Sequence, residues 1–279
     1  MIGASAPIIH PTDFSDDSMN AFAHALKIST VANCRLYVAH VADRSGTQEW
    51  HAFPHVRQTL ARWGLLDANA STAAIFERLG VEVVKVEIEP GDPVRGVTRF
   101  LETHPSGLMV LATAAREGLP RWLRPSIAEA MSRRAHMQTL FIPPHNRSLV
   151  DAATGDLDLN RILIPVDHRP SPLRAIKAIQ QFYRALGAKP EIRILHVGRS
   201  APVVATVSSP SHRAPVDVPI EVRDGDIVEG ILQAAKEMRA NLIGMPTAGH
   251  HGLLDALRGS TTEQVLRHAP CPVLAIPVA

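Results

Sequence analysis

The chain contains only two cysteines, Cys34 and Cys271, and they stand far apart in the sequence. Disulfide scaffolds and cysteine metal sites need closely and regularly spaced cysteines, so neither is predicted here. Both cysteines lie beside apolar stretches. We therefore predict buried free thiols in a reducing cytosol.

A strong net charge and a long apolar run are also missing. The formal net charge is +2 over 279 residues, so electrostatics gives no reason to expect nucleic acid or an acidic membrane as a partner. The longest apolar runs have the length of single strands, far below the roughly 20 residues that cross a bilayer. The first residues show neither a basic region nor a long apolar one. No signal peptide is predicted, and a cytoplasmic location is expected.

The sequence also lacks recognisable catalytic motifs. The sequence has no nucleophile elbow and no Walker-type lysine after a glycine-rich loop. Among its 14 histidines, His250 and His251 have no carboxylate or cysteine at ligand spacing. His40 and His196 end equivalent strands, where a structural role is expected, and His10 is a candidate to face a crevice. We expect no catalytic residue, no metal ligands and no enzyme, with a weak ATPase activity left open.

What the chain does contain is an internal repeat. Ile243 to Ala279 is predicted to form a strand, a glycine-bearing loop, a helix and a short strand. Ser260 has a glutamate three residues later, the spacing of a capping box at a helix start. Leu108 to Pro144 repeats this order with Ser126 as the matching serine. The free amides of such a helix start bind phosphate, and a plain capped helix is the equal alternative.

The remaining sequence alternates strand and helix in both halves, with the continuous apolar strands typical of a parallel sheet covered on both faces. Residues 145–160 are polar and turn-rich without periodicity, which predicts a linker. The predicted fold class is α/β, with two similar open parallel-sheet domains in tandem over residues 1–147 and 158–279. Predicted strands cover residues 7–11, 35–41, 81–88, 108–112, 161–165, 191–197, 220–222 and 272–276. Predicted helices cover 16–29, where Ser15 suits the helix start, and 55–66, 72–79, 94–104, 173–186 and 227–240.

With these features the chain resembles a tandem universal stress protein, with two domains of that family in one polypeptide. The motifs that carry the resemblance occur in the same order in both halves: PTDFS and PVDHRPS after the first strand, AHV and LHV at the end of the second, a Gly-Asp turn, and a capped helix, followed in the second half by HAPCPVLAIP. The resemblance covers nearly everything except the linker and residues 43–80 and 200–218. It implies a Rossmann-like, adenine nucleotide α-hydrolase-like fold. It also implies that the two domains pair within the chain, with a further homodimer left open.

The ATP-binding members of that family carry a loop of glycine, two residues, glycine, nine residues, and then glycine with serine or threonine. In the second half Gly249, Gly259 and Ser260 fit this loop, but Pro246 occupies the first glycine position. Proline removes an amide and fixes φ, so it does not replace a glycine at a close backbone approach. The first half has no glycine at the four corresponding positions, which are Ala112, Ala115, Pro125 and Ser126. Nucleotide binding is therefore expected in the second half rather than the first.

The resemblance implies a set of contacts for ATP or another adenine nucleotide, with or without magnesium. The residues are Pro165 and Asp167 around the adenine, Val197 against the base, Met245 and Gly249 beside ribose and phosphates, and Gly259, Ser260 and Thr261 on phosphate. Simpler roles stay open: a loop cap for Asp167, core packing for Val197 and a first-turn bond for Thr261.

Two functions follow from these patterns. One is a stress-response module that binds an adenine nucleotide in its C-terminal half. The other is a nucleotide-free module that recruits an unknown protein partner, and Pro246 favours it. Trp122, inside the degenerate first-half loop, is a candidate to fill the vacated pocket with apolar bulk.

Overall fold

Strands and helices alternate from Ile8 to Val278 in the computed structural model, which describes residues 6–42, 52–113, 125–144, 147–168, 172–200, 219–248 and 261–278. The chain divides into two compact units. Unit 1 comprises Met1–Pro144 with Val150–Leu157, and unit 2 comprises His145–Leu149 with Asp158–Ala279. The predicted linker is thus divided between the two units.

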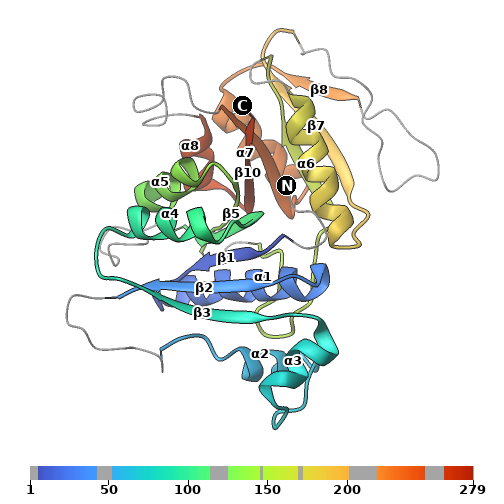
Figure 1. Cartoon of the computed structure of the whole chain (residues 1–279). Coiled ribbons are helices and arrows are strands. Elements are labelled where there is room, and N and C mark those ends of the chain that lie inside the picture. The colour runs from blue at the N-terminus through green and yellow to red at the C-terminus, as the bar shows by residue number, and fades with distance from the viewer. Residues whose placement is uncertain are drawn as a thin grey trace. The chain divides into compact units, whose positions relative to one another are not determined.

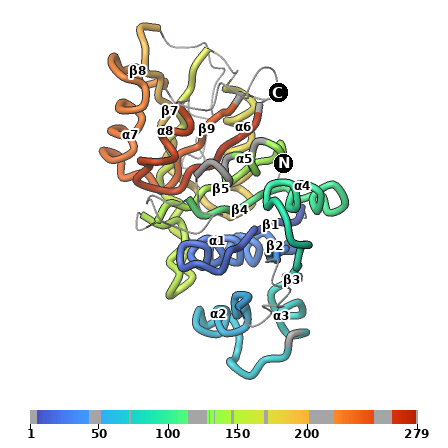
Figure 2. The backbone as a smooth tube through the Cα atoms, turned by 90° about the vertical axis from the view of Figure 1, so that its left-hand side faces the viewer, coloured from blue at the N-terminus to red at the C-terminus, as the bar shows by residue number. Residues whose placement is uncertain are grey.

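Unit 1 is an open parallel sheet with the strand order β3-β2-β1-β4-β5. Helix α1 packs against β1, β2 and β4, and helices α4 and α5 cover the opposite face (Figures 1 and 2). The elements are β1 Ile8–Pro11, α1 Asp16–Ala32, β2 Leu36–Val41, α2 Val56–Arg62, α3 Thr72–Leu79, β3 Val83–Ile88, α4 Pro93–Thr103, β4 Leu108–Ala112, α5 Pro125–Ala135 and β5 Gln138–Ile142.

Unit 2 repeats this arrangement with the strand order β10-β9-β6-β7-β8, again parallel throughout. Helix α6 packs on β9 and β10, and helix α7 packs on β6 and β7 with α8 beside it (Figure 2). The elements are β6 Arg161–Pro165, α6 Pro172–Ala185, β7 Glu191–Val197, β8 Ile220–Arg223, α7 Ile227–Glu237, β9 Leu242–Ala248, α8 Thr261–His268 and β10 Val273–Val278. The predicted fold class is confirmed, with element ends shifted by a few residues.

Local signals in the sequence explain where several helices begin and end. Ser15 caps α1 through its side chain, which accepts the N–H of Ser18, and Asn33 ends α1 in the left-handed conformation. Asp92 and Asp226 cap α4 and α7 in the same way, so the two predicted Gly-Asp turns are equivalent helix starts. These caps satisfy amides that have no partner within the helix.

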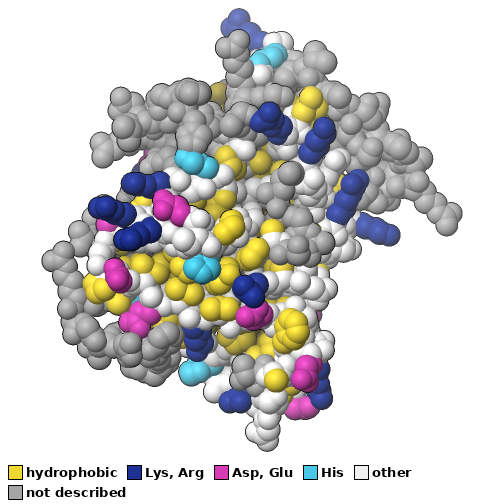
Figure 3. Space-filling view, in the orientation of Figure 1, with side chains coloured by type: hydrophobic (Ala, Val, Ile, Leu, Met, Phe, Trp, Pro, Cys, Tyr) yellow, Lys and Arg dark blue, Asp and Glu magenta, His cyan; other side chains and the backbone are white. Residues whose placement is uncertain are grey.

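The core of unit 1 lies along strands β1, β4 and β5. Every residue of β1, β4 and β5 is buried, whereas the edge strand β3 is half-buried along its length. Both cysteines are buried and unpaired, as predicted, and burial raises the pKa of the Cys34 thiol to about 11 and that of Cys271 to about 12. Lys, Arg, Asp and Glu side chains are interspersed on the face drawn in Figure 3. Within the described residues, no helix has the length and apolar character needed to cross a bilayer.

Strand β9 approaches helix α6 so closely that one position requires glycine. A Cβ atom at Gly244 would lie 2.3 Å from Cδ1 of Ile179, a fully buried side chain. We expect Gly244→Ala to lower the free energy of unfolding by about 1–3 kcal/mol, because the core must shift to admit the methyl group. Gly91→Ala is the matched control, since a Cβ there meets no atom within 4 Å. Urea unfolding followed by circular dichroism measures both, and an equal effect of the two variants would contradict the prediction.

Candidate functional site

The carboxyl ends of β6 and β9 separate in unit 2. These two strands pair only at Ile162–Leu242 and Leu163–Ile243, and beyond this point each strand pairs with its outer neighbour alone. The chain leaves β6 toward β7 on one side and reaches β9 on the other, so this is the topological switch point of the sheet. Open α/β sheets bind their ligands in the crevice outside the carboxyl ends of the strands at such a point.

Four predicted site residues lie on the strands at this end of unit 2 or just beyond them. Pro165 ends β6 and Met245 lies in β9, and both are buried. Val197 ends β7 and is 9% exposed. Asp167 follows β6, and its side chain is 61% exposed. The described part of the crevice therefore combines buried apolar side chains with one accessible carboxylate.

Val197 also has a packing role that is independent of any ligand. A Cβ at Gly230 of α7 would lie 2.9 Å from Cγ2 of Val197, so the helix approaches the end of β7 at the glycine. Unit 1 has the same arrangement between Gly96 of α4 and Val41 at the end of β2, at 3.4 Å. This contact supports the simpler interpretation of Val197 as a core residue.

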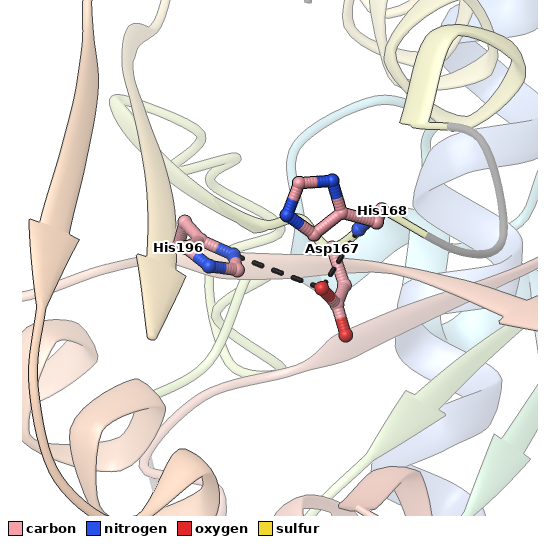
Figure 4. A group of neighbouring side chains, drawn as sticks. All are labelled: Asp167, His168 and His196. Carbon is pink, nitrogen blue, oxygen red and sulfur yellow. Dashed lines mark hydrogen bonds and ion pairs between the residues drawn. The ribbon is translucent and has the colours of Figure 1, made fainter. Parts of the chain in front are cut away.

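Asp167 lies beside two histidines in a cluster that the sequence analysis missed (Figure 4). Its Oδ1 atom accepts the backbone N–H of His168 at 2.7 Å and lies 3.9 Å from Nδ1 of the buried His196. Nδ1 of His196 donates to the Val166 carbonyl at 3.0 Å, and Nε2 of His168 lies 3.0 Å from the Ser200 carbonyl. The sequence did contain a signal for this cluster, because Asp167 and His168 follow one predicted strand and His196 lies at the end of the next.

The phosphate side of the predicted site lies mostly outside the described residues. These undescribed positions include Gly249, Gly259, Ser260, His250, His251 and the first-half Trp122. Thr261 begins helix α8 and is half-buried. Pro246 lies within β9, opposite Ile276 of β10 and beyond the last pair with β6. A backbone donor is therefore missing from β9 near the switch point.

Unit 1 has the equivalent switch point between β1 and β4, which pair only at Ile8–Leu108 and Ile9–Met109. A cavity of ≈ 20 Å³ lies there, which is large enough to hold a water molecule. Asp13 lines this cavity, and its Oδ2 atom is buried with no hydrogen-bond partner among the described residues. Its Oδ1 atom accepts from the backbone and hydroxyl of Ser15 at 3.1 and 2.7 Å. The other lining residues are Pro11, Thr12, Ser18, Leu111, Ala112, Ala128 and Met131.

His10 lies in the core of unit 1 rather than facing the crevice. Its ring is fully buried, with Nδ1 bonded to the Val110 carbonyl at 3.0 Å and Nε2 3.4 Å from the Ser18 hydroxyl. Burial lowers the pKa of His10 to about 4, although both hydrogen bonds and Asp13 act in the opposite direction. His10 therefore stays neutral at physiological pH and joins β1 to β4 and α1.

Comparison with known proteins shows to which family the chain belongs. The family model described as "Universal stress protein family" matches residues 6–143 and 203–277. This chain belongs to the universal stress protein family. A universal stress protein of Methanocaldococcus jannaschii is 29% identical over 138 residues, which are 48% of this chain and 80% of the relative.

Solved structures of universal stress proteins show the same tandem fold. One from Archaeoglobus fulgidus matches with a TM-score of 0.63 at 18% identity, covering 98% of this chain and 96% of the other. A putative universal stress protein from Pseudomonas aeruginosa matches with a TM-score of 0.61 at 16% identity, covering 98% and 93%. At these identities the likeness establishes the fold.

Proposed function

We propose that this universal stress protein is a stress-response module that binds one adenine nucleotide, ATP, in unit 2. The observation that carries the proposal is the separation of β6 from β9, which opens the switch point beside Asp167. The apolar side chains of Pro165 and Met245 suit the flat adenine ring, and the accessible Asp167 carboxylate accepts hydrogen bonds from its polar edge. Thr261 at the start of α8 suits the phosphates.

In this proposal unit 1 binds no nucleotide. At its switch point the Asp13 carboxylate is held by Ser15, and the corresponding loop positions carry no glycine. Proline at residue 125 and alanine at residue 112 also replace glycines of the nucleotide loop. The expected stoichiometry is therefore one nucleotide per chain.

A nucleotide-free module that recruits a protein partner is the second candidate function, and Pro246 is the observation that favours it. In this alternative the separation of β6 and β9 is a remnant of the family architecture. The proline in β9 then marks a phosphate loop that has lost its function.

Isothermal titration with ATP and magnesium tests the proposal, once absorbance of the denatured protein has shown that no nucleotide was purified with the chain. We expect one equivalent to bind and Gly259→Val to abolish binding, because a branched side chain blocks the backbone approach to phosphate. Pro246→Gly completes the glycine loop and is expected to tighten binding. Absence of binding in both the unmodified chain and Pro246→Gly would favour the partner-recruiting alternative.

A further inference from the structure

We propose that Asp167, His168 and His196 form a binding site for a divalent transition-metal ion such as Zn²⁺, at the carboxyl ends of β6 and β7. One potential ligand atom from each residue lies within 4.8 Å of the other two. Figure 4 shows the carboxylate and both rings gathered at the ends of the two strands. The inference rests on these three side chains and not on the proposed binding of ATP.

The distances are short enough for one ion to be reached by small movements. Zn²⁺ bonds of about 2.0–2.1 Å place tetrahedral ligands about 3.3–3.4 Å apart. The Asp167 Oδ1 and His196 Nδ1 atoms are already 3.9 Å apart. His196 is buried, so its ring has the least freedom to move and is the fixed ligand. Asp167 and His168 are exposed side chains that need only rotate to close around the ion.

Metal coordination replaces the hydrogen bond of the His196 ring and keeps that of the His168 ring. A neutral imidazole carries its single proton on one nitrogen and offers a lone pair on the other. When Nδ1 of His196 binds the ion, its proton moves to Nε2, and the bond to Val166 is exchanged for the bond to the metal. The His168 ring keeps its bond to the Ser200 carbonyl through Nε2 when its Nδ1 binds the ion, and metal-bound histidines are commonly oriented in this way.

The three ligands favour one class of ion, and they leave one coordination position free. Two imidazoles and one carboxylate suit Zn²⁺, Co²⁺ or Ni²⁺, whereas Mg²⁺ prefers oxygen ligands and a shell of water. Three protein ligands leave a further position for water or an incoming anion, and the exposed side of the cluster faces solvent.

Unit 1 shows what the same positions look like without the third ligand. Asp13 and His40 occupy the places of Asp167 and His196, and Nδ1 of His40 bonds to the Thr12 carbonyl at 2.8 Å. Phe14 replaces His168 and stacks on His40 with ring centroids 4.1 Å apart. The cluster is therefore specific to unit 2, and the chain contains its own control.

Competition titration of Zn²⁺ against a chromogenic chelator, in the absence of nucleotide, tests the site on the full chain. We expect one ion per chain and an affinity at least about tenfold weaker in His168→Phe, the variant that copies unit 1. His40→Gln is the matched control and should leave the affinity unchanged. Circular dichroism shows whether each variant is folded.

A second variant tests the position of the fixed ligand without removing it. A Cβ at Gly198 would lie 2.7 Å from Nε2 of His196, so Gly198→Ala must displace the ring. We expect this variant to weaken Zn²⁺ binding as well. The proposal is overturned by no saturable binding below about 1 mM, or by equal affinity in the unmodified chain and His168→Phe. Failure of ATP to bind leaves all of these results unaffected.

Discussion

Acidification from pH 6.5 to pH 4 should unfold unit 1 while unit 2 remains folded, because two neutral histidines are buried in unit 1. Burial lowers the pKa of His10 and of His24 from 6.5 to about 4. In this pH window the unfolded chain binds a proton at each histidine and the folded chain does not. Stability therefore falls as the pH falls, by on the order of 3 kcal/mol per histidine over the whole window.

Unit 2 lacks both groups. Counted from the aspartate that follows the first strand of each unit, Ile164 takes the place of His10 and Ala178 the place of His24. His24 also has a structural task, since its Nδ1 bonds to the Asn20 carbonyl at 2.8 Å and its Nε2 accepts the N–H of Val150 at 3.2 Å. Protonation of Nε2 removes that acceptor and releases Val150 from helix α1.

Tryptophan fluorescence measures this transition selectively, because Trp50, Trp63 and Trp122 all belong to unit 1. Far-ultraviolet circular dichroism reports the helices and strands of both units. As the pH falls, we expect the fluorescence change to be complete while the circular dichroism signal of unit 2 remains. His24→Gln should lower the pH slope of the stability of unit 1 by about one proton, or about 1.4 kcal/mol per pH unit. The exposed His268→Gln is the control variant. Coincident transitions with an unchanged slope would contradict the prediction.

Gly155→Ala should destabilise unit 1 by about 2–5 kcal/mol, which combines a backbone cost with a steric one. Gly155 has φ +73°, a left-handed conformation that costs a residue with Cβ about 1–2 kcal/mol. A Cβ there would also lie 2.5 Å from Cδ2 of Trp63, in the rigid part of the indole ring. The same turn holds Trp63 through the Ala152 carbonyl, which accepts from Nε1 at 3.1 Å.

Gly64→Ala separates the two costs. Gly64 has φ +70°, but a Cβ there would meet no atom within 4 Å. The difference between the two alanine variants in urea unfolding, followed by tryptophan fluorescence, is therefore the steric cost of displacing Trp63. We expect Gly155→Ala to be the less stable variant by about 1–3 kcal/mol. Equal stability of the two variants would show that the turn does not pack tightly on the indole.

Local patterns were enough to predict the strands, the helices and their order. The runs of apolar residues in the strands and the periodicity of the helices are local properties, and so are caps such as Ser15, Asp92 and Asp226. Two copies of one strand and helix order also determined the fold class, because a parallel sheet is the arrangement that buries such strands on both faces.

The contacts between side chains that are distant in sequence arise from the packing of the folded chain. His196 lies far along the chain from Asp167 and His168, and the parallel pairing of β6 with β7 brings them together. The same holds for Trp63 with Gly155 and for His24 with Val150, where a segment without periodicity packs on helices far from it in sequence. Local patterns do not encode these contacts. The histidine cluster depends on the pairing of β6 with β7, and the other two contacts depend on where residues 150–157 pack within unit 1.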